Sequence, residues 1–245
     1  MHKKHAFLFA LLITILIAIN LSILEQTSQK LEIVKISRII DGDTIELEDG
    51  RRIRLLNINT PEKNKPNYNL SIIFLQKFLN SSVQIETKGL GKYGRTLARI
   101  YAPEYLNLEL VKKGFASKYL VDESELNTFS QAEKKAIQSS LGIWERSPHF
   151  NCLKSEIDKI KEKVLLISNC NDINMTSWVL KDESTRHYTF KNIKFGEITL
   201  HTEKGIDNGT EIFWNSKTNI WNNDRDALFI FDKQGKIVHY KTYGY

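Results

Sequence analysis

The sequence predicts a mainly β protein with a smaller share of α-helix, arranged as two domains behind an N-terminal apolar helix. Three observations predict this class. The chain has 245 residues, 41% of them apolar, which is enough for two modest cores. Residues 31–148 alternate β-branched segments with helical ones, whereas residues 164–245 show short strands with turns about every eight to twelve residues, a pattern typical of a β-sandwich. An apolar run precedes both regions.

The N-terminal segment, residues 1–30, predicts export of the chain. Lys3 and Lys4 precede an apolar run of 19 residues at positions 6–24, which is long enough to span a bilayer. Because no convincing small-residue cleavage site follows, we favour an uncleaved transmembrane anchor that leaves both domains at the cell surface. The membrane is then a partner of this helix. A cleaved signal peptide, followed by secretion, is the alternative.

Residues 31–148 predict a strand meander followed by further strands and helices. The hairpin signal Asp49-Gly50 joins the second and third segments of the meander. The expected strands are residues 31–40, 44–47, 52–58, 83–88 and 96–101, and the expected helices are residues 70–79, 106–113 and 125–140. The second helix is followed by Gly114, a residue at which helices commonly end. This order of elements fits a barrel with flanking helices.

Charged side chains gather in three short motifs of this region. The motifs are Asp41-Gly-Asp43-Thr44, then Arg54 with Asn59-Thr60-Pro-Glu62, then Lys92-Tyr93-Gly-Arg95. A phosphodiester is a stable anion, so its cleavage requires neutralised charge, activated water and stabilised five-coordinate phosphorus. A hard cation held by carboxylates, a glutamate base and two arginines can supply these. Taken singly, each motif is an ordinary turn or loop, but their order and spacing together favour phosphodiester cleavage.

These motifs resemble the staphylococcal nuclease (thermonuclease) family over residues 31–148. The matching stretches are residues 39–45, 53–62, 92–98, 110–116 and 142–144. The resemblance implies an OB-fold barrel with flanking helices, and a calcium-dependent endonuclease that acts on DNA and RNA and leaves a 3′-phosphate. It also implies Asp43 and the backbone carbonyl of Thr60 as calcium ligands, Glu62 as the water-activating base, and Arg54 and Arg95 as clamps on the phosphate.

Residue 59 departs from the family pattern. Calcium-binding members carry an aspartate where this chain has Asn59, whose amide oxygen is an acceptable but uncharged ligand. We therefore expect weaker metal binding, and a catalytically weak or inactive nucleic-acid-binding surface protein stays open as an alternative. Asp41 is a candidate for an outer carboxylate beside the metal. Lys92 and Tyr93 are candidates for substrate contact, Tyr93 through base stacking, although packing at the barrel rim is the simpler role for Tyr93.

Residues 149–245 predict a linker followed by a second domain. Residues 149–163 read as a linker in which residues 154–163 form a short charged helix. Residues 164–245 resemble a lamin-tail domain, which has an immunoglobulin-like fold, through the stretches 177–182, 196–202 and 220–232. The resemblance implies a non-catalytic domain that tethers or targets the protein to an unknown partner. The formal charge is +3 over residues 31–148 and +1 over residues 149–245, a mild basic excess that fits transient contact with polyanions.

Two cysteines agree with export. Cys152 and Cys170 enclose 17 residues, and in an oxidising compartment an even count predicts one disulfide, with two separate buried thiols as the alternative. Three classes of function stay open from the sequence. The leading one is an exported nuclease, the second is a binding protein that has lost catalysis, and the third is an interaction scaffold that does not touch nucleic acid.

Overall fold

A computed structural model describes residues 5, 12–15, 31–191, 193 and 196–245. The helix expected over residues 1–30, and with it the anchor or signal, lies mostly outside these residues. Within the described ranges, no helix is long and apolar enough to cross a membrane.

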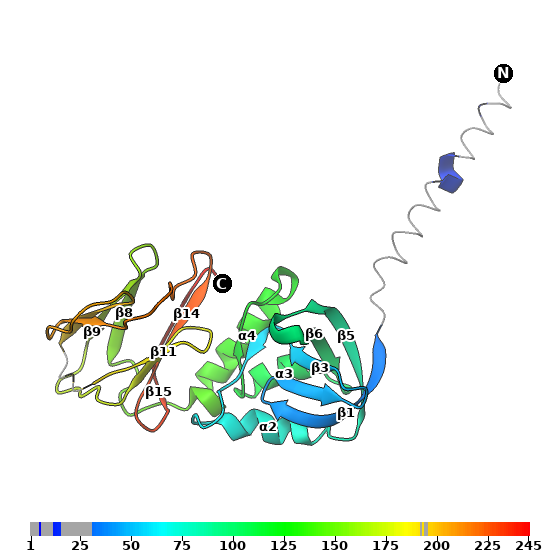
Figure 1. The fold of residues 1–245 in the computed structure, drawn as a ribbon, viewed down its shortest axis with the longest axis horizontal. Coiled ribbons are helices and arrows are strands. Elements are labelled where there is room, and N and C mark those ends of the chain that lie inside the picture. The colour runs from blue at the N-terminus through cyan, green and yellow to red at the C-terminus, as the bar shows by residue number, and fades with distance from the viewer. Residues whose placement is uncertain (1–4, 6–11, 16–30, 192, 194–195) are drawn as a thin grey trace.

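Five strands of the first half close into a barrel in the order β1-β2-β3-β6-β5 (Figure 1). They are β1 (Glu32–Asp41), β2 (Thr44–Leu47), β3 (Arg52–Leu55), β5 (Ser82–Leu90) and β6 (Thr96–Tyr101). Only the β3–β6 contact is parallel among these pairs. The inward side chains are β-branched or aliphatic, as strand alternation predicts, and Ile45, Ile53 and Ile100 are fully buried. A closed five-stranded barrel agrees with the expected OB-fold class.

Three helices and a two-stranded ribbon flank the barrel. The helices are α2 (Tyr68–Gln76), α3 (Leu106–Lys112) and α4 (Leu126–Gln138), with single 3₁₀ turns at η1 (Lys92–Gly94), η2 (Glu123–Glu125) and η3 (Gly142–Trp144). The ribbon pairs β4 (Ile58–Asn59) with β7 (Ser117–Lys118). α3 is followed by Gly114, whose φ of +67° is the left-handed conformation that glycine adopts without strain. The expected helices are therefore confirmed. α2 lies two to three residues nearer the N-terminus than expected, and α3 and α4 are one to three residues shorter.

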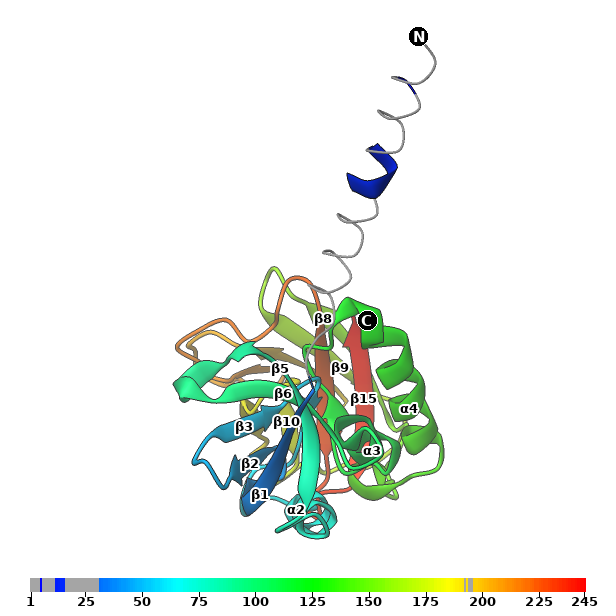
Figure 2. The same cartoon turned by 90° about the vertical axis from the view of Figure 1, so that its right-hand side faces the viewer.

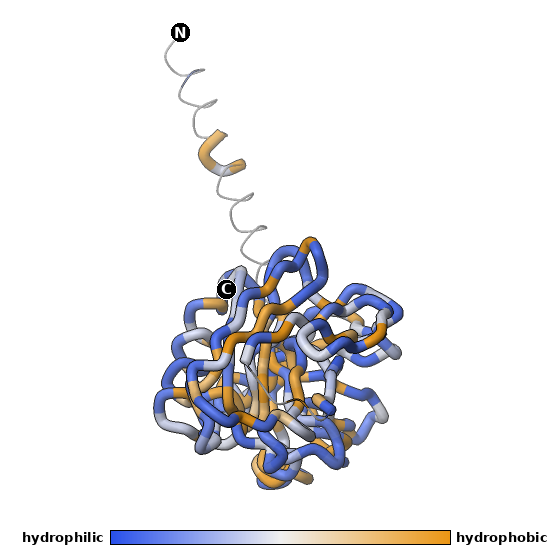
Figure 3. Tube along the Cα trace, turned by 90° about the vertical axis from the view of Figure 1, so that its left-hand side faces the viewer, coloured by the Kyte–Doolittle hydropathy of each residue, from blue (hydrophilic) through white to orange (hydrophobic). Residues whose placement is uncertain are grey.

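The second half contains two four-stranded sheets over one apolar core. One sheet has the order β11-β10-β14-β15 and the other β13-β12-β9-β8. Their bounds are β8 (Leu153–Asp158), β9 (Lys163–Ser168), β10 (Val179–Lys181), β11 (His187–Thr189), β12 (Glu197–His201), β13 (Glu211–Phe213), β14 (Asp226–Phe231) and β15 (Ile237–Tyr243). Trp178 and Trp221 are buried in the shared core. Figure 3 shows apolar segments inside and hydrophilic segments around them. The immunoglobulin-like class stays a prediction.

The charged helix expected over residues 154–163 is wrong. These residues form β8, a turn and the start of β9, and the two strands pair antiparallel from Leu153–Ser168 to Asp158–Lys163. Apolar residues at 153, 157, 160 and 164 suggested helical spacing, but Ile160 lies 76% exposed at the hairpin tip. Pairing with β12 and burial against the second sheet outweigh local propensity here. The sandwich therefore begins within the expected linker.

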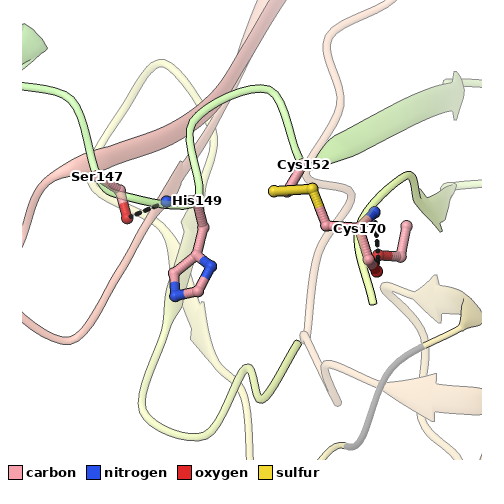
Figure 4. The surroundings of a disulfide bond; sticks show 5 residues. Ser147, His149, Cys152 and Cys170 are labelled. Atoms are coloured by element: carbon pink, nitrogen blue, oxygen red, sulfur yellow. Dashed lines mark hydrogen bonds between the residues drawn. A yellow bond between two sulfur atoms is a disulfide. The ribbon is translucent and has the colours of Figure 1, made fainter. Parts of the chain in front are cut away.

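Cys152 and Cys170 form a disulfide, which confirms the prediction. The bond joins the chain just before β8 to the loop that follows β9, with Cα atoms 5.2 Å apart. Figure 4 shows it beside the turn at Ser147 and His149, where the His149 backbone N–H donates to Ser147 Oγ at 3.2 Å. The disulfide thus closes the hairpin that opens the second half.

The two halves meet in a third apolar cluster. Trp144 of η3 stacks on Phe229 of β14, with ring centroids 5.8 Å apart, and meets Tyr240 of β15 edge-on at 4.8 Å. Ala136 of α4 and Ile237 of β15 belong to the same cluster. Figure 2 places β15 alongside α4, where the Tyr240 hydroxyl donates to Glu133 Oε2 at 2.8 Å. Because β14 is buried on both faces, one against its own sandwich and one against the first half, its sequence is almost continuously apolar.

Candidate active site

Strand pairing brings the first and second motifs together. Thr44 of β2 lies opposite Arg54 of β3, so Asp43, in the turn before β2, faces the same end of the barrel. Arg54 Nη2 lies 3.0 Å from Asp43 Oδ2, and both side chains are largely buried. Arg95, just before β6, donates from Nη1 to Thr44 Oγ1 at 3.3 Å. The antiparallel arrangement expected for β2 and β3 is confirmed, and it joins the three motifs at one edge.

Two guanidinium groups converge at this edge. Burial lowers the pKa of Arg54, Asp43 raises it, and the nearby charge of Arg95 lowers it again. Arg54 Nη1 is fixed by the carbonyl of Leu55 at 2.5 Å. Because the two cations repel each other without an anion between them, an anionic oxygen bound there would be stabilised by both.

Carboxylates also concentrate here. Burial raises the pKa of Glu62, and the charges of Asp41 and Asp43 raise it further, against the lowering effect of Lys181 and Arg54. Burial likewise raises the pKa of Asp41, and Asp43 adds to this effect while the Gly42 N–H opposes it. A glutamate whose pKa lies above its ordinary value is better matched to accepting a proton near neutral pH.

The donor set fits a hard cation in chemistry. Asp41, Asp43 and Glu62 raise the local negative charge, and a divalent cation would relieve their repulsion. The turn at Gly42 approaches Thr60 so closely that an added Cβ would lie 2.6 Å from Thr60 Oγ1. Only glycine allows that approach, which brings Asp43 Oδ2 to 3.4 Å from the same hydroxyl. In the described part of the chain, however, no three His, Cys, Asp or Glu side chains form a metal-holding group. A cation here would therefore depend on amide and carbonyl oxygens as well.

Asn59 has a role that its position in the motif did not indicate. Its side-chain nitrogen donates to the carbonyls of Glu183 at 3.1 Å and Ser184 at 3.3 Å, both in the second half of the chain. Its oxygen accepts from Arg54 Nη2 at 3.3 Å. An aspartate could not donate to these carbonyls. The amide at residue 59 therefore joins the active-site edge to the second half.

Lys92 and Tyr93 lie on the outer rim. They form η1, where the Lys92 carbonyl accepts from Arg95 Nε at 3.4 Å and the Tyr93 ring centroid lies 5.9 Å from Arg95 Cζ. Tyr93 is 93% exposed. The exposed ring, which contacts Arg95 among the charged groups of the site, lies where a ligand near Arg95 would meet it, and its stacking on a base stays a prediction.

A cavity of about 320 Å³ adjoins Glu62 and is shared by both halves of the chain. Residues 59–67 form one wall, and β10, β11 and β14 form the other. Lys181 and His187, in register with each other across β10 and β11, both line it. Neither residue belongs to a motif that the sequence predicts to be functional. The signal that could have found them is strand alternation, which turns Lys181 away from the sandwich core.

Comparison with known proteins agrees with the motifs. The family model described as Staphylococcal nuclease homologue matches residues 52–146. The chain is 37% identical over 126 residues to a thermonuclease of Staphylococcus intermedius, covering 45% of this chain and 75% of the relative. It is 34% identical over 120 residues to an uncharacterized endonuclease of Escherichia coli, with the same coverage. An uncharacterized endonuclease of Haemophilus influenzae is 33% identical over 133 residues, covering 50% and 72%. On this similarity, the chain belongs to the staphylococcal nuclease family.

Proposed function

We propose that this chain is a calcium-dependent endonuclease that hydrolyses phosphodiester bonds of DNA and RNA. The enzyme class, a nuclease hydrolase, follows from family membership. The observation that supports the proposal best is the convergence of Arg54, Arg95 and Asp43 with Glu62 at one edge of the barrel. These groups are the cationic clamps, the hard-ion ligand and the base that phosphodiester hydrolysis requires.

Each side chain has a defined task in the reaction. Glu62 takes a proton from a water molecule as the water oxygen attacks phosphorus. The bond from phosphorus to the 5′-oxygen breaks, and that oxygen takes up a proton, so the products carry a 3′-phosphate and a 5′-hydroxyl. Arg54 and Arg95 donate hydrogen bonds to the non-bridging oxygens, whose charge grows in the five-coordinate transition state.

Calcium would be held by the Asp43 carboxylate, the Asn59 amide oxygen and the Thr60 carbonyl, with Asp41 close by. When bound, it supplies positive charge that polarises the phosphoryl group and its bound water. Because only part of this donor set is charged, calcium affinity should be modest. A binding protein with little catalysis is the second candidate, and it is favoured by the contact of the Asn59 amide oxygen with Arg54.

The location and the second half complete the proposal. The apolar run at residues 6–24 supports export with retention at the cell surface by a membrane anchor, or secretion after cleavage. The disulfide supports an oxidising compartment. We assign residues 31–148 to the nuclease domain. Residues 149–163 are assigned to the join, and residues 164–245 to a lamin-tail-like domain of immunoglobulin-like fold, which binds a target of unknown identity.

Substitution of the proposed base tests the function. Glu62→Gln keeps the shape of the side chain but cannot accept the proton, so the cleavage rate of an oligonucleotide in calcium should fall about 10²- to 10⁴-fold. Arg54→Ala and Arg95→Ala should lower the rate by a comparable factor. Glu104→Gln, on the exposed loop after β6, is the matched control. Unchanged rates in all three site variants would refute the assignment. A wild-type chain that binds the oligonucleotide with or without calcium but never cleaves it would favour the second candidate.

A further inference from the structure

Lys181 belongs to the second half of the chain but faces the active-site cavity. Along β10 the side chains alternate, and Leu180 is fully buried in the sandwich core opposite Ile230. Lys181 therefore lies on the other face of the sheet, opposite Phe229 of β14. Its ammonium lies 5.0 Å from the Phe229 ring centroid, and both residues line the cavity beside Glu62.

The Lys181 ammonium has no anionic partner within the residues that the structure describes. Within this described part of the chain, no salt bridge or hydrogen bond joins it to another side chain, and the ammonium lies over the aromatic face of Phe229. Burial lowers the pKa of Lys181, while Asp182 and Glu62 raise it from a distance. A partly buried cation without a paired anion is costly, and an anionic ligand in the cavity would remove that cost.

The position of Lys181 relative to the catalytic edge is fixed from both sides. Two and three residues further along the chain, Glu183 and Ser184 accept hydrogen bonds from Asn59 through their carbonyls. The Glu183 backbone N–H donates to Asp226 Oδ1 at 3.1 Å within the second half. Lys181 is thus held beside Glu62 by the same short segment that accepts the Asn59 amide.

The cavity carries more positive than negative side chains. Lys65, Lys181 and Lys233 line it, against Glu62 and Asp232. The Asp232 Oδ1 atom already accepts hydrogen bonds from the backbone N–H groups of Gln234 and Lys236, each at 2.9 Å. With a volume near 320 Å³, the cavity is too small for a duplex but matches one small ligand or chain unit.

We propose that Lys181 binds a phosphate group of the nucleic acid chain, next to the phosphate that is cleaved, so that the C-terminal sheet completes the substrate site. This inference rests on the proposed nuclease function. The second half then acts on substrate directly, in addition to any role in targeting. Lys65 and Lys233, both exposed, also line the cavity and add positive charge to it.

Salt-dependent binding tests the inference. In the Glu62→Gln background, which slows cleavage about 10²- to 10⁴-fold, the affinity for a short fluorescein-labelled oligothymidylate is measured by anisotropy in calcium over a range of salt concentrations. Lys181→Gln should weaken binding about tenfold and reduce the salt slope by about 0.7, the value for one phosphate contact on a single strand. Lys181→Arg keeps the charge and should retain the parent slope. Lys204→Gln, an exposed lysine of the same half, should change neither quantity.

Three outcomes would overturn the inference. In the first, Lys181→Gln and its Glu62→Gln parent have the same affinity and the same salt slope. In the second, Lys181→Gln and Lys181→Arg lose the same amount of affinity and slope. In the third, the parent does not bind the oligonucleotide. Far-ultraviolet circular dichroism checks that each variant is folded, and the Lys181→Arg arm separates lost charge from lost packing on Phe229. Cleavage by the wild-type chain is measured separately. Binding that depends on Lys181 without any cleavage would refute the proposed function and leave this inference standing.

Discussion

Asn59→Asp tests whether residue 59 serves the metal or the contact between the two halves. The sequence alone predicts a gain, since the substitution adds a charged calcium ligand. The structure adds an opposing effect. The side-chain nitrogen that donates to the Glu183 and Ser184 carbonyls becomes an oxygen. The two carbonyl oxygens then face a carboxylate oxygen, which cannot donate a hydrogen bond to them. Closer pairing with Arg54 Nη2, now 3.3 Å from the Asn59 oxygen, offsets part of the loss.

The size of the loss follows from the number of hydrogen bonds. Each ordinary hydrogen bond contributes about 1 kcal/mol net, and a buried acceptor left without a partner costs about 1–3 kcal/mol. Two bonds are lost, and Asn59 is only 6% exposed, so water cannot fully replace them. After the gain at Arg54, we expect Asn59→Asp to lower the free energy of unfolding by about 2 kcal/mol without calcium. For a chain of this size, that lowers Tm by about 4–8 °C.

Thermal unfolding in chelator and in calcium separates the two effects. We expect Asn59→Asp to unfold below wild type in chelator, and calcium to raise its Tm more than that of wild type because the added charge tightens the site. Asn59→Ala loses the hydrogen bonds without adding an acceptor. In chelator, its Tm should therefore lie between those of wild type and Asn59→Asp. Equal Tm values for wild type and Asn59→Asp in chelator would refute the role of the amide in joining the halves. Calcium titrations that superimpose would place residue 59 outside the metal shell.

Two further predictions concern the second half. Burial raises the pKa of Glu183 to about 7, with Asp226 and Asp182 adding to the effect against the Tyr245 hydroxyl, so the folded state favours the protonated acid. The stability that the protonated Glu183 contributes is full below about pH 4.5 and is lost as pH rises through 7. Glu183→Gln should therefore have a higher Tm than wild type at pH 8 but not at pH 4.5. A difference in Tm that does not change with pH would contradict this reasoning. Reduction of the Cys152–Cys170 disulfide should cost about 3 kcal/mol of unfolding free energy and leave calcium-dependent cleavage at moderate temperature intact. Loss of cleavage in a chain that is still folded would show that the disulfide shapes the active site.

The elements that follow local patterns could be predicted from the sequence. The hairpin at Asp49-Gly50, the strands of the barrel and the helix that precedes Gly114 all have short-range signals, and the structure confirms them. Residues 154–163, expected as a short charged helix, instead form most of the hairpin of β8 and β9. Only pairing with β12 in the second sheet decides between them, and that contact is distant in sequence.

In the active site, too, residues joined by neighbouring strands could be predicted from the sequence, and contacts between the two halves could not. Asp43, Arg54 and Arg95 meet through neighbouring strands, so motif order and strand pairing were sufficient to place them together. The contact of Asn59 with the Glu183 carbonyl spans 124 residues and ends on a backbone atom. A backbone acceptor has no residue type of its own, so no motif could reveal it. Lys181 was hidden for a related reason, because its neighbours in sequence belong to a sheet with no catalytic pattern.

The charge of the site depends on both halves of the chain, which argues against an active site confined to residues 31–148. Asparagine in place of the family aspartate removes one negative charge beside Asp43, and Lys181 adds one positive charge beside Glu62. Together they make the site two charges more positive than a barrel that carries the aspartate and has no second half. By Coulomb's law this weakens the hold on a cation and strengthens the hold on a phosphate. Since the segment that carries Lys181 also accepts hydrogen bonds from the amide of Asn59, the two charge changes are structurally linked. If calcium serves this site as proposed, the second half would supply part of the charge neutralisation that the ion otherwise provides.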